Sequence, residues 1–142
     1  MTQAATAATA GVVQLERTLR HPPEKVWKAL TDASLIGQWL MSTDFQPVVG
    51  HRFTFRSPTS GPGWNGVIDG EVLEVRENQR LAYRWDSSGE EKANGLATVV
   101  TWTLEPMGGG TRLRLEQSGF QPKDRYAEQG AAQGWPRMID TL

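Results

Sequence analysis

Two carboxylates, Asp69 and Glu71, stand two residues apart in a segment that alternates as a β-strand does, from residue 66 to residue 76. Without a bulge, both side chains project from the same face of that strand. On an inward face they would give an apolar pocket a polar anchor or a general base of raised pKa. On an outward face they are solvated, which is the usual setting of unpaired acids. A bulge at Gly70 would break the alternation and turn one of them to solvent.

Histidine chemistry is restricted to His21 and His51, so a multi-histidine metal site is not available. His51 follows Gly50 at the start of an expected strand, where a solvated or rim position is favoured over catalysis. The chain has no Cys, which excludes disulfides, cysteine catalysis and thiolate metal sites. No nucleophile elbow or phosphate-binding loop occurs. We therefore expect no metal and no cofactor, keep Asp69, Glu71 and His51 as catalytic candidates, and favour a protein that binds over one that catalyses.

The charge balance and hydropathy of the chain restrict the classes of partner that it can bind. The 142 residues carry 15 basic and 16 acidic side chains, for a net charge of -1. A balanced charge gives no reason to expect nucleic acid, which requires clustered positive charge. No apolar stretch is long enough for insertion into a membrane, and the first eleven residues lack the basic and apolar regions of a secretory signal. We expect one cytoplasmic domain.

Aromatic side chains are the most informative feature of the composition, because six of the twelve are Trp. Trp combines a large apolar surface with one N–H donor, so it suits the walls of a pocket as well as a core. Several aromatics fall on the apolar faces of alternating segments and could enclose an apolar ligand. The same residues could equally fill a dry core. The candidate ligand-binding residues are Trp39, Phe53, Phe55, Trp64, Tyr83, Trp85, Trp102, Phe120, Trp135 and Met138.

The order of expected elements defines the architecture. Residues 1–11 form a flexible tail, and residues 12–142 form one domain that begins with a strand from Val12 to Leu19. Two short helices follow, the first starting at Pro23 and the second capped by Thr31 or Asp32. Strands are then expected near residues 45–48, 51–57, 66–76, 80–86, 96–105 and 111–118, before a C-terminal helix. A single antiparallel sheet must bury one face, and that helix is what can cover it. A curved sheet and a slim helix cannot meet everywhere, which predicts a cavity.

Several segments in this order resemble the family named after the activator of Hsp90 ATPase homologue 1, in its single-domain bacterial form. They are PPEKVWKALTD, LIGQWL, GHRFTFR, GEVLEV, RLAYRW, TWTLEP, GGGTRLRLEQSGF and QGW, and together they span nearly the whole chain from Val12. The resemblance implies an α+β helix-grip fold of the START-like, Bet v 1-like superfamily. In that fold a curved antiparallel sheet of about six to seven strands surrounds the C-terminal helix, and a hydrophobic cavity lies between them.

The resemblance implies no fixed catalytic residues, since the superfamily includes lipid and hormone carriers, polyketide cyclases and co-chaperone domains. The first functional expectation is binding of a hydrophobic or amphipathic small molecule, with a connection to stress. An enzyme of the cyclase, dehydratase or hydrolase kind in the same cavity is the alternative. A co-chaperone-type interaction module is a further alternative, so a homodimer and a chaperone are the protein partners to consider.

Pro136 departs from the family pattern because it falls inside the expected long helix. Proline removes a helical hydrogen bond and clashes with the preceding turn. We therefore expect a new helix to start at Pro136. Because the segment after Pro136 is too short to cross a sheet alone, residues 123–133 are expected to supply another helical piece. In the absence of such a piece, the cavity would be partly open.

Overall fold

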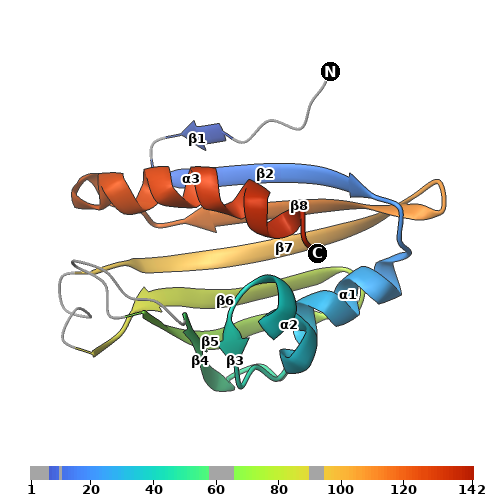
Figure 1. Ribbon diagram of the computed structural model, residues 1–142, viewed down its shortest axis with the longest axis horizontal. Coiled ribbons are helices and arrows are strands. Elements are labelled where there is room, and N and C mark those ends of the chain that lie inside the picture. The colour runs from blue at the N-terminus through green and yellow to red at the C-terminus, as the bar shows by residue number, and fades with distance from the viewer. Residues whose placement is uncertain (1–6, 10, 58–65, 90–94) are drawn as a thin grey trace.

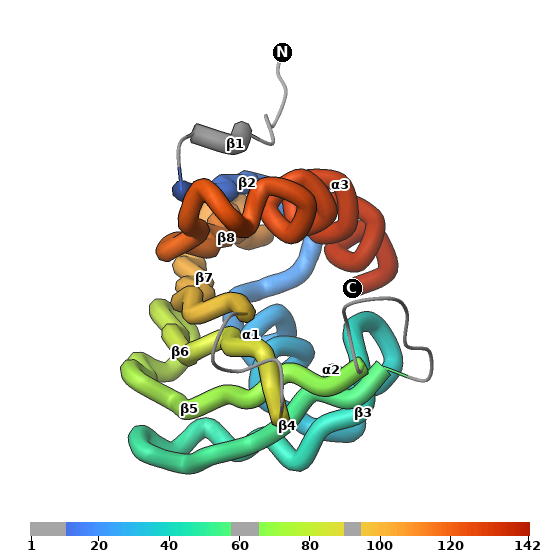
Figure 2. Tube along the Cα trace, turned by 90° about the vertical axis from the view of Figure 1, so that its left-hand side faces the viewer, coloured from blue at the N-terminus to red at the C-terminus, as the bar shows by residue number. Residues whose placement is uncertain are grey.

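The computed structural model describes residues 7–9, 11–57, 66–89 and 95–142. Its described part contains one antiparallel sheet in the order β1-β2-β8-β7-β6-β5-β4-β3. The sheet curls, with α3 against its β2 and β8 side and with α1 and α2 within the curve (Figures 1 and 2). The strands are β1 (Ala7–Thr9), β2 (Val12–Leu19), β3 (Ser42–Thr43), β4 (Arg52–Arg56), β5 (Val67–Arg76), β6 (Arg80–Ser87), β7 (Ala97–Met107) and β8 (Gly110–Ser118). The helices are α1 (Pro23–Thr31), α2 (Ala33–Trp39), the 3-10 turn η2 (Pro122–Asp124) and α3 (Arg125–Ile139).

This arrangement confirms the predicted α+β helix-grip architecture. The six long strands agree with the segments predicted from alternation, and short strands extend the two edges of the sheet. β1 lies within the segment that we expected to be a flexible tail, where Ala7–Thr9 pair with the start of β2. None of the described helices has the length and apolarity needed to cross a membrane.

Local chemistry explains why two helices follow β2. Pro22 and Pro23 end the strand, and Pro23 occupies the start of α1, where its missing N–H costs nothing. Asp32 separates the helices, and its Oδ1 accepts a hydrogen bond from Leu35 N at 3.2 Å. Of the two residues predicted to cap the second helix, Asp32 is therefore the one that does so. α1 buries Val26 and Leu30 in the core.

One predicted strand, near residues 45–48, is wrong. The chain forms only the two-residue strand β3 before it turns, and Phe45 packs instead against Phe53 at a ring-centroid distance of 4.9 Å. Pro47 cannot donate a hydrogen bond to a neighbouring strand. The backbone N–H of Phe45 bonds to the Thr43 hydroxyl, so a local turn replaces the expected ladder.

α3 is one helix that runs through Pro136, so no new helix starts there, and residues 125–133 supply the additional helical piece that we expected. Helical residues begin at Arg125, so the 15-residue helix is about 22 Å long at the normal rise per residue. Trp135 and Ile139 are both buried against the sheet. Their packing offsets the hydrogen bond that Pro136 removes, and the helix is long enough to cross the sheet.

Candidate ligand-binding cavity

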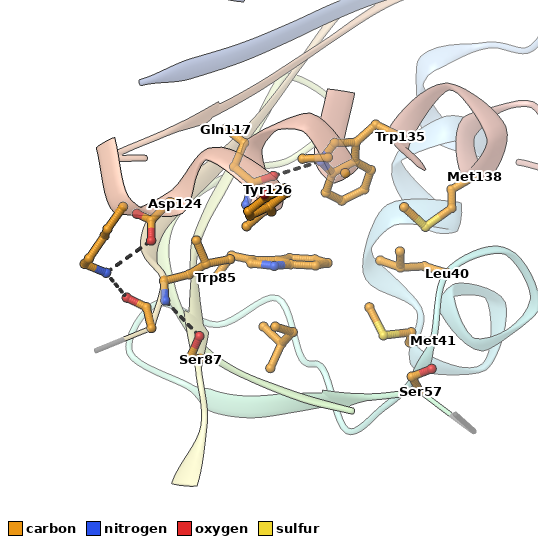
Figure 3. A pocket seen from close by; sticks show the side chains of 17 residues that line it. Leu40, Met41, Ser57, Trp85, Ser87, Gln117, Asp124, Tyr126, Trp135 and Met138 are labelled. Atoms are coloured by element: carbon orange, nitrogen blue, oxygen red, sulfur yellow. Dashed lines mark hydrogen bonds and ion pairs between the residues drawn. The ribbon is translucent and has the colours of Figure 1, made fainter. Parts of the chain in front are cut away.

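A cavity of about 760 Å³ lies between α3 and the inner face of the sheet. Its walls come from the end of α2, from β5, β6 and β8, and from η2 and α3 (Figure 3). Apolar side chains form most of this surface. The lining residues are Leu40, Met41, Ser57, Ile68, Trp85, Ser87, Gly95, Leu96, Gln117, Lys123, Asp124, Tyr126, Ala127, Gly130, Ala131, Trp135 and Met138.

The cavity exists because the first half of α3 presents small residues to the sheet. Ala127, Gly130 and Ala131 stand at i, i+3 and i+4, so they share one face of the helix. α3 rests against β2, at the far side of the curved sheet from β5. Short side chains on the helix cannot reach the inner face of β5 and β6, and the space between them stays unfilled.

Large aromatic rings close the space farther along α3. Trp135 contacts Trp85 on β6 and Trp102 on β7, with ring-centroid distances of 5.2 and 5.5 Å. Trp102 in turn meets the edge of Trp39 at 5.9 Å. These rings separate the cavity from a packed aromatic core, so Trp85 and Trp135 form its floor.

A chain of buried hydrogen bonds fixes the polar group in that floor. The Trp135 indole N–H donates to Gln117 Oε1 at 2.9 Å, and Gln117 Nε2 donates to Thr98 Oγ1 at 3.0 Å. The Thr98 hydroxyl donates to the backbone carbonyl of Trp85 at 2.6 Å. Because an indole N–H can only donate, the Gln117 oxygen must face Trp135. The amide nitrogen is thereby held as a donor.

The side of the cavity near η2 carries a pair of opposite charges. Lys123 Nζ donates to the Gly95 carbonyl at 2.9 Å and pairs with Asp124 Oδ1 at 3.1 Å. The other oxygen of Asp124 accepts from Gln121 N, which ties η2 to the start of α3. Asp124 is only 7% exposed, and these contacts satisfy its charge. Ser87 adds a hydroxyl whose oxygen accepts from Leu96 N at 2.8 Å.

Three of the ten residues predicted to bind ligand line this cavity, namely Trp85, Trp135 and Met138. Trp64 lies outside the described residues. The other six are buried in the packed core: Trp39, Phe53, Phe55, Tyr83, Trp102 and Phe120. Alternation along the strands places a side chain on the inner face, but it does not say whether a neighbouring element covers that position.

The polar groups of three residues predicted to bind ligand are engaged inside the protein. The Tyr83 hydroxyl accepts from the Trp102 indole N–H at 3.0 Å. Burial raises the pKa of the Tyr83 hydroxyl far above its ordinary value, and the Trp102 hydrogen bond opposes that rise only in part. The Trp39 indole N–H donates to Ala29 O at 2.8 Å. Tyr83 and Trp39 therefore stabilise the core.

Two signals in the sequence would have located the cavity more closely. Leu113, Leu115 and Gln117 occupy one face of β8, so Gln117 is a polar residue at an inward position. The small residues at 127, 130 and 131 mark a gap on the inner face of the last helix. The sequence interpretation gave weight to aromatic residues and passed over both signals.

Asp69 and Glu71 lie on the outer face of β5, and neither contributes to the cavity wall. Gly70 faces inward between them, where a Cβ atom would overlap the ring of Phe53. The bulge in β5 falls between Val72 and Glu74 and not at Gly70, so both acids keep the outward direction. Glu71 pairs with Arg52 at 3.8 Å, while Asp69 accepts from Ser88 Oγ at 2.9 Å.

His51 does not line the cavity either. Its Nε2 lies 3.0 Å from the backbone carbonyl of Asp44, and its ring stacks with Phe53. No group of three or more potential metal ligands occurs within the part of the chain that the structure describes. The three catalytic candidates are thus not brought together at the cavity.

Comparison with known proteins agrees with the fold. Residues 20–142 match the model of the family described as Activator of Hsp90 ATPase homolog 1-like protein. The crystal structure of MLL2253 from Mesorhizobium loti is 48% identical with a TM-score of 0.83, and the match covers 92% of each chain. No curated protein matches the chain.

Two more distant solved structures share the fold alone. The solution structure of the Aha1 dimer from Colwellia psychrerythraea is 20% identical with a TM-score of 0.75 over 92% of each chain. CalU16 from Micromonospora echinospora is 22% identical with a TM-score of 0.73, covering 92% of this chain and 73% of CalU16.

Proposed function

The chain belongs to the Activator of Hsp90 ATPase homolog 1-like family, and from this premise we propose that it binds a hydrophobic or amphipathic small molecule between α3 and the sheet. The observation that carries the proposal is the cavity of about 760 Å³. That volume lies within the usual range of ligand sites, and an apolar wall with a few placed polar groups is typical of them.

The energetics favour an occupied cavity. Trp85, Trp135, Leu40 and Met41 present apolar surface to this space. Removing apolar surface from water contributes about 25 cal/mol per Å². Met side chains also adapt to ligands of different shape. A ligand with an apolar body would gain this burial without displacing any side chain from the packed core.

A cavity-filling substitution tests the proposal. Ala131→Leu adds three carbon atoms on the face of α3 that lines the space, so we expect binding of the uncharged dye N-phenylnaphthylamine to be lost while the fold is retained. Gln129→Leu introduces the same leucine side chain at an exposed position of the same helix and should leave binding unchanged. Dye fluorescence and circular dichroism measure the two properties. Native mass spectrometry of freshly purified protein should show a bound small molecule that is absent from Ala131→Leu.

Equal dye binding by the wild type and Ala131→Leu would contradict the proposal. So would a wild-type protein that binds no apolar probe.

An enzyme that uses the same cavity is the alternative. Among the described lining residues the one carboxylate is Asp124, and both of its oxygens are committed to hydrogen bonds or ion pairing. The outward position of Asp69 and Glu71 also favours binding over catalysis. Loss of turnover in Asp69→Asn, Glu71→Gln or His51→Gln, with ligand affinity retained, would favour the enzyme.

Protein partners are a separate proposal. The Colwellia relative is described as a dimer, and we propose self-association for this chain as well. Sedimentation velocity over a range of concentrations measures it, and a monomer at all concentrations would contradict it. A chaperone partner would be supported by co-purification that survives high salt. A cytoplasmic setting is proposed for both interactions.

A further inference from the structure

The cavity is more polar at one end than at the other. Figure 3 shows Ser87 and Asp124 toward one end and Leu40 and Met41 toward the other, where Ser57 is the one polar side chain labelled. Strands β6 and β8 are both antiparallel to β7, so they run in the same direction. Ser87 ends β6 level with Leu96, whereas Gln117 of β8 pairs with Val100, four residues farther along β7, so the two side chains lie in the same half of the sheet without being neighbours.

The polar end offers hydrogen-bond donors. Gln117 is 1% exposed, and one of its two amide hydrogens is committed to Thr98. The second amide hydrogen can bond to an acceptor in the cavity. Ser87 is 8% exposed and accepts through its oxygen from Leu96 N, so its own hydroxyl hydrogen is oriented away from that bond. Both buried groups therefore suit a ligand atom with lone pairs.

The charges at this end cancel. Lys123 and Asp124 are the two charged residues among the described lining, and they pair at 3.1 Å. A ligand carboxylate would lie beside the Asp124 carboxylate, whose side chain is 6% exposed, in a wall with no net positive charge. Burying a charge is costly unless it is paired. A neutral oxygen avoids that cost and still accepts hydrogen bonds.

We infer that the cavity takes an uncharged ligand, with an apolar body toward Leu40 and Met41 and a carbonyl or ether oxygen that accepts from Ser87 or from Gln117. This inference rests on the proposed binding function and specifies its ligand class. It distinguishes a ketone, ester or aldehyde from a fatty acid of the same length.

Three probes with closely matched chains test it on the full-length protein. Methyl nonyl ketone and decanoic acid share the same carbonyl and tail, and undecane has no acceptor. At neutral pH we expect the ketone to bind about tenfold more tightly than undecane, as one or two net hydrogen bonds provide. It should also bind at least about tenfold more tightly than the acid. Displacement of N-phenylnaphthylamine measures all three affinities.

An acid that binds as tightly as the ketone would overturn the inference and leave the proposed function intact. A protein that binds none of the three would overturn both. A ketone that binds no more tightly than undecane would show that neither Ser87 nor Gln117 strengthens binding by a hydrogen bond, and it would overturn the inference.

Asp124→Asn supplies a second test that does not depend on absolute affinities. The substitution keeps an acceptor for Gln121 N and removes the negative charge from the lining. We expect the affinity for decanoic acid relative to that for the ketone to rise several-fold in the variant. Lys123→Met should change the acid affinity in the opposite direction. An unchanged ratio of acid to ketone in Asp124→Asn would overturn the inference, and should the variant fail to fold, the wild-type comparison decides alone.

Discussion

Trp102 and Trp85 are the same residue type in two different settings. Trp102 is completely buried between Trp39 and Trp135, so Trp102→Ala should lower the free energy of unfolding by about 3–5 kcal/mol. Trp85 already faces the cavity on one side, and Trp85→Ala should cost less stability. It should instead weaken ligand binding at least about tenfold, as loss of an aromatic anchor does. Urea unfolding and dye titration give the two quantities.

Equal stability losses for the two variants, with affinity retained in Trp85→Ala, would mean that Trp85 belongs to the core.

The contrast between Trp85 and Trp102 also shows what the sequence cannot predict at single positions. Both residues alternate onto the apolar faces of their strands, so their direction was predictable. Their depth depends on Trp135 and on the path of α3, which no pattern within β6 or β7 encodes.

Tyr83 should make stability depend on pH in the alkaline range. Burial raises the pKa of its hydroxyl in the folded state, whereas an unfolded chain has the ordinary value near 10. Above about pH 10 the unfolded state therefore binds fewer protons than the folded state. The stabilisation is complete below that pH and falls as the pH rises, by about 1.4 kcal/mol per pH unit. Urea unfolding from about pH 8 to about pH 11, on both sides of that ordinary pKa, measures the slope of the unfolding free energy against pH.

Tyr83→Phe is the matched variant, because it keeps the ring and removes the titrating group. It leaves the Trp102 N–H without its acceptor, so we expect a loss of about 1–3 kcal/mol at neutral pH. Its alkaline slope should be shallower than that of the wild type. Identical slopes would contradict the assignment of the pH dependence to Tyr83.

Gly130 in α3 and Gly70 in β5 should respond to alanine in opposite ways. A Cβ at Gly130 would meet no atom within 4 Å, so Gly130→Ala should stabilise the helix by about 0.5–1 kcal/mol. At Gly70 a Cβ would overlap the Phe53 ring, so the core must shift. Gly70→Ala should therefore lower the free energy of unfolding by about 1–3 kcal/mol. Thermal unfolding of both variants measures the difference. A stabilising Gly70→Ala would show that the Phe53 ring moves freely.

The elements themselves were largely predictable, and the errors have local causes. Alternation located the long strands, and Pro23 and Asp32 defined the two short helices. Pro136 predicted a break that the buried neighbours Trp135 and Ile139 override, since tertiary packing outweighs one lost helical bond. The cavity depends on Ala127, Gly130 and Ala131, whose meaning becomes clear only when the distance from helix to sheet is known.

At the level of the complete chain, the fold explains why a cavity forms, but only three of the ten residues predicted to bind ligand line it. A curved sheet and a single covering helix leave space by geometry, which the sequence predicted. How much aromatic surface fills that space depends on contacts among β4, β6, β7 and α3. Six of the ten predicted residues are buried in the core, four of them on β4, β6 and β7, and the remaining space takes its shape from Leu40, Met41 and the start of α3.

We propose that residues 12–142 form the functional domain, and removal of the residues before Gly11 tests this. The shortened chain keeps Gly11, whose carbonyl accepts from Gly119 N and Phe120 N. It loses the three-residue pairing of β1 with β2. Each lost hydrogen bond is worth about 1 kcal/mol, but each released residue regains about 1–2 kcal/mol of backbone entropy. The two contributions nearly cancel, so the free energy of unfolding should change by less than about 1 kcal/mol, and dye binding should persist because β1 does not line the cavity. A loss above about 3 kcal/mol in urea unfolding would instead make β1 an integral strand, since edge pairing alone cannot supply that much.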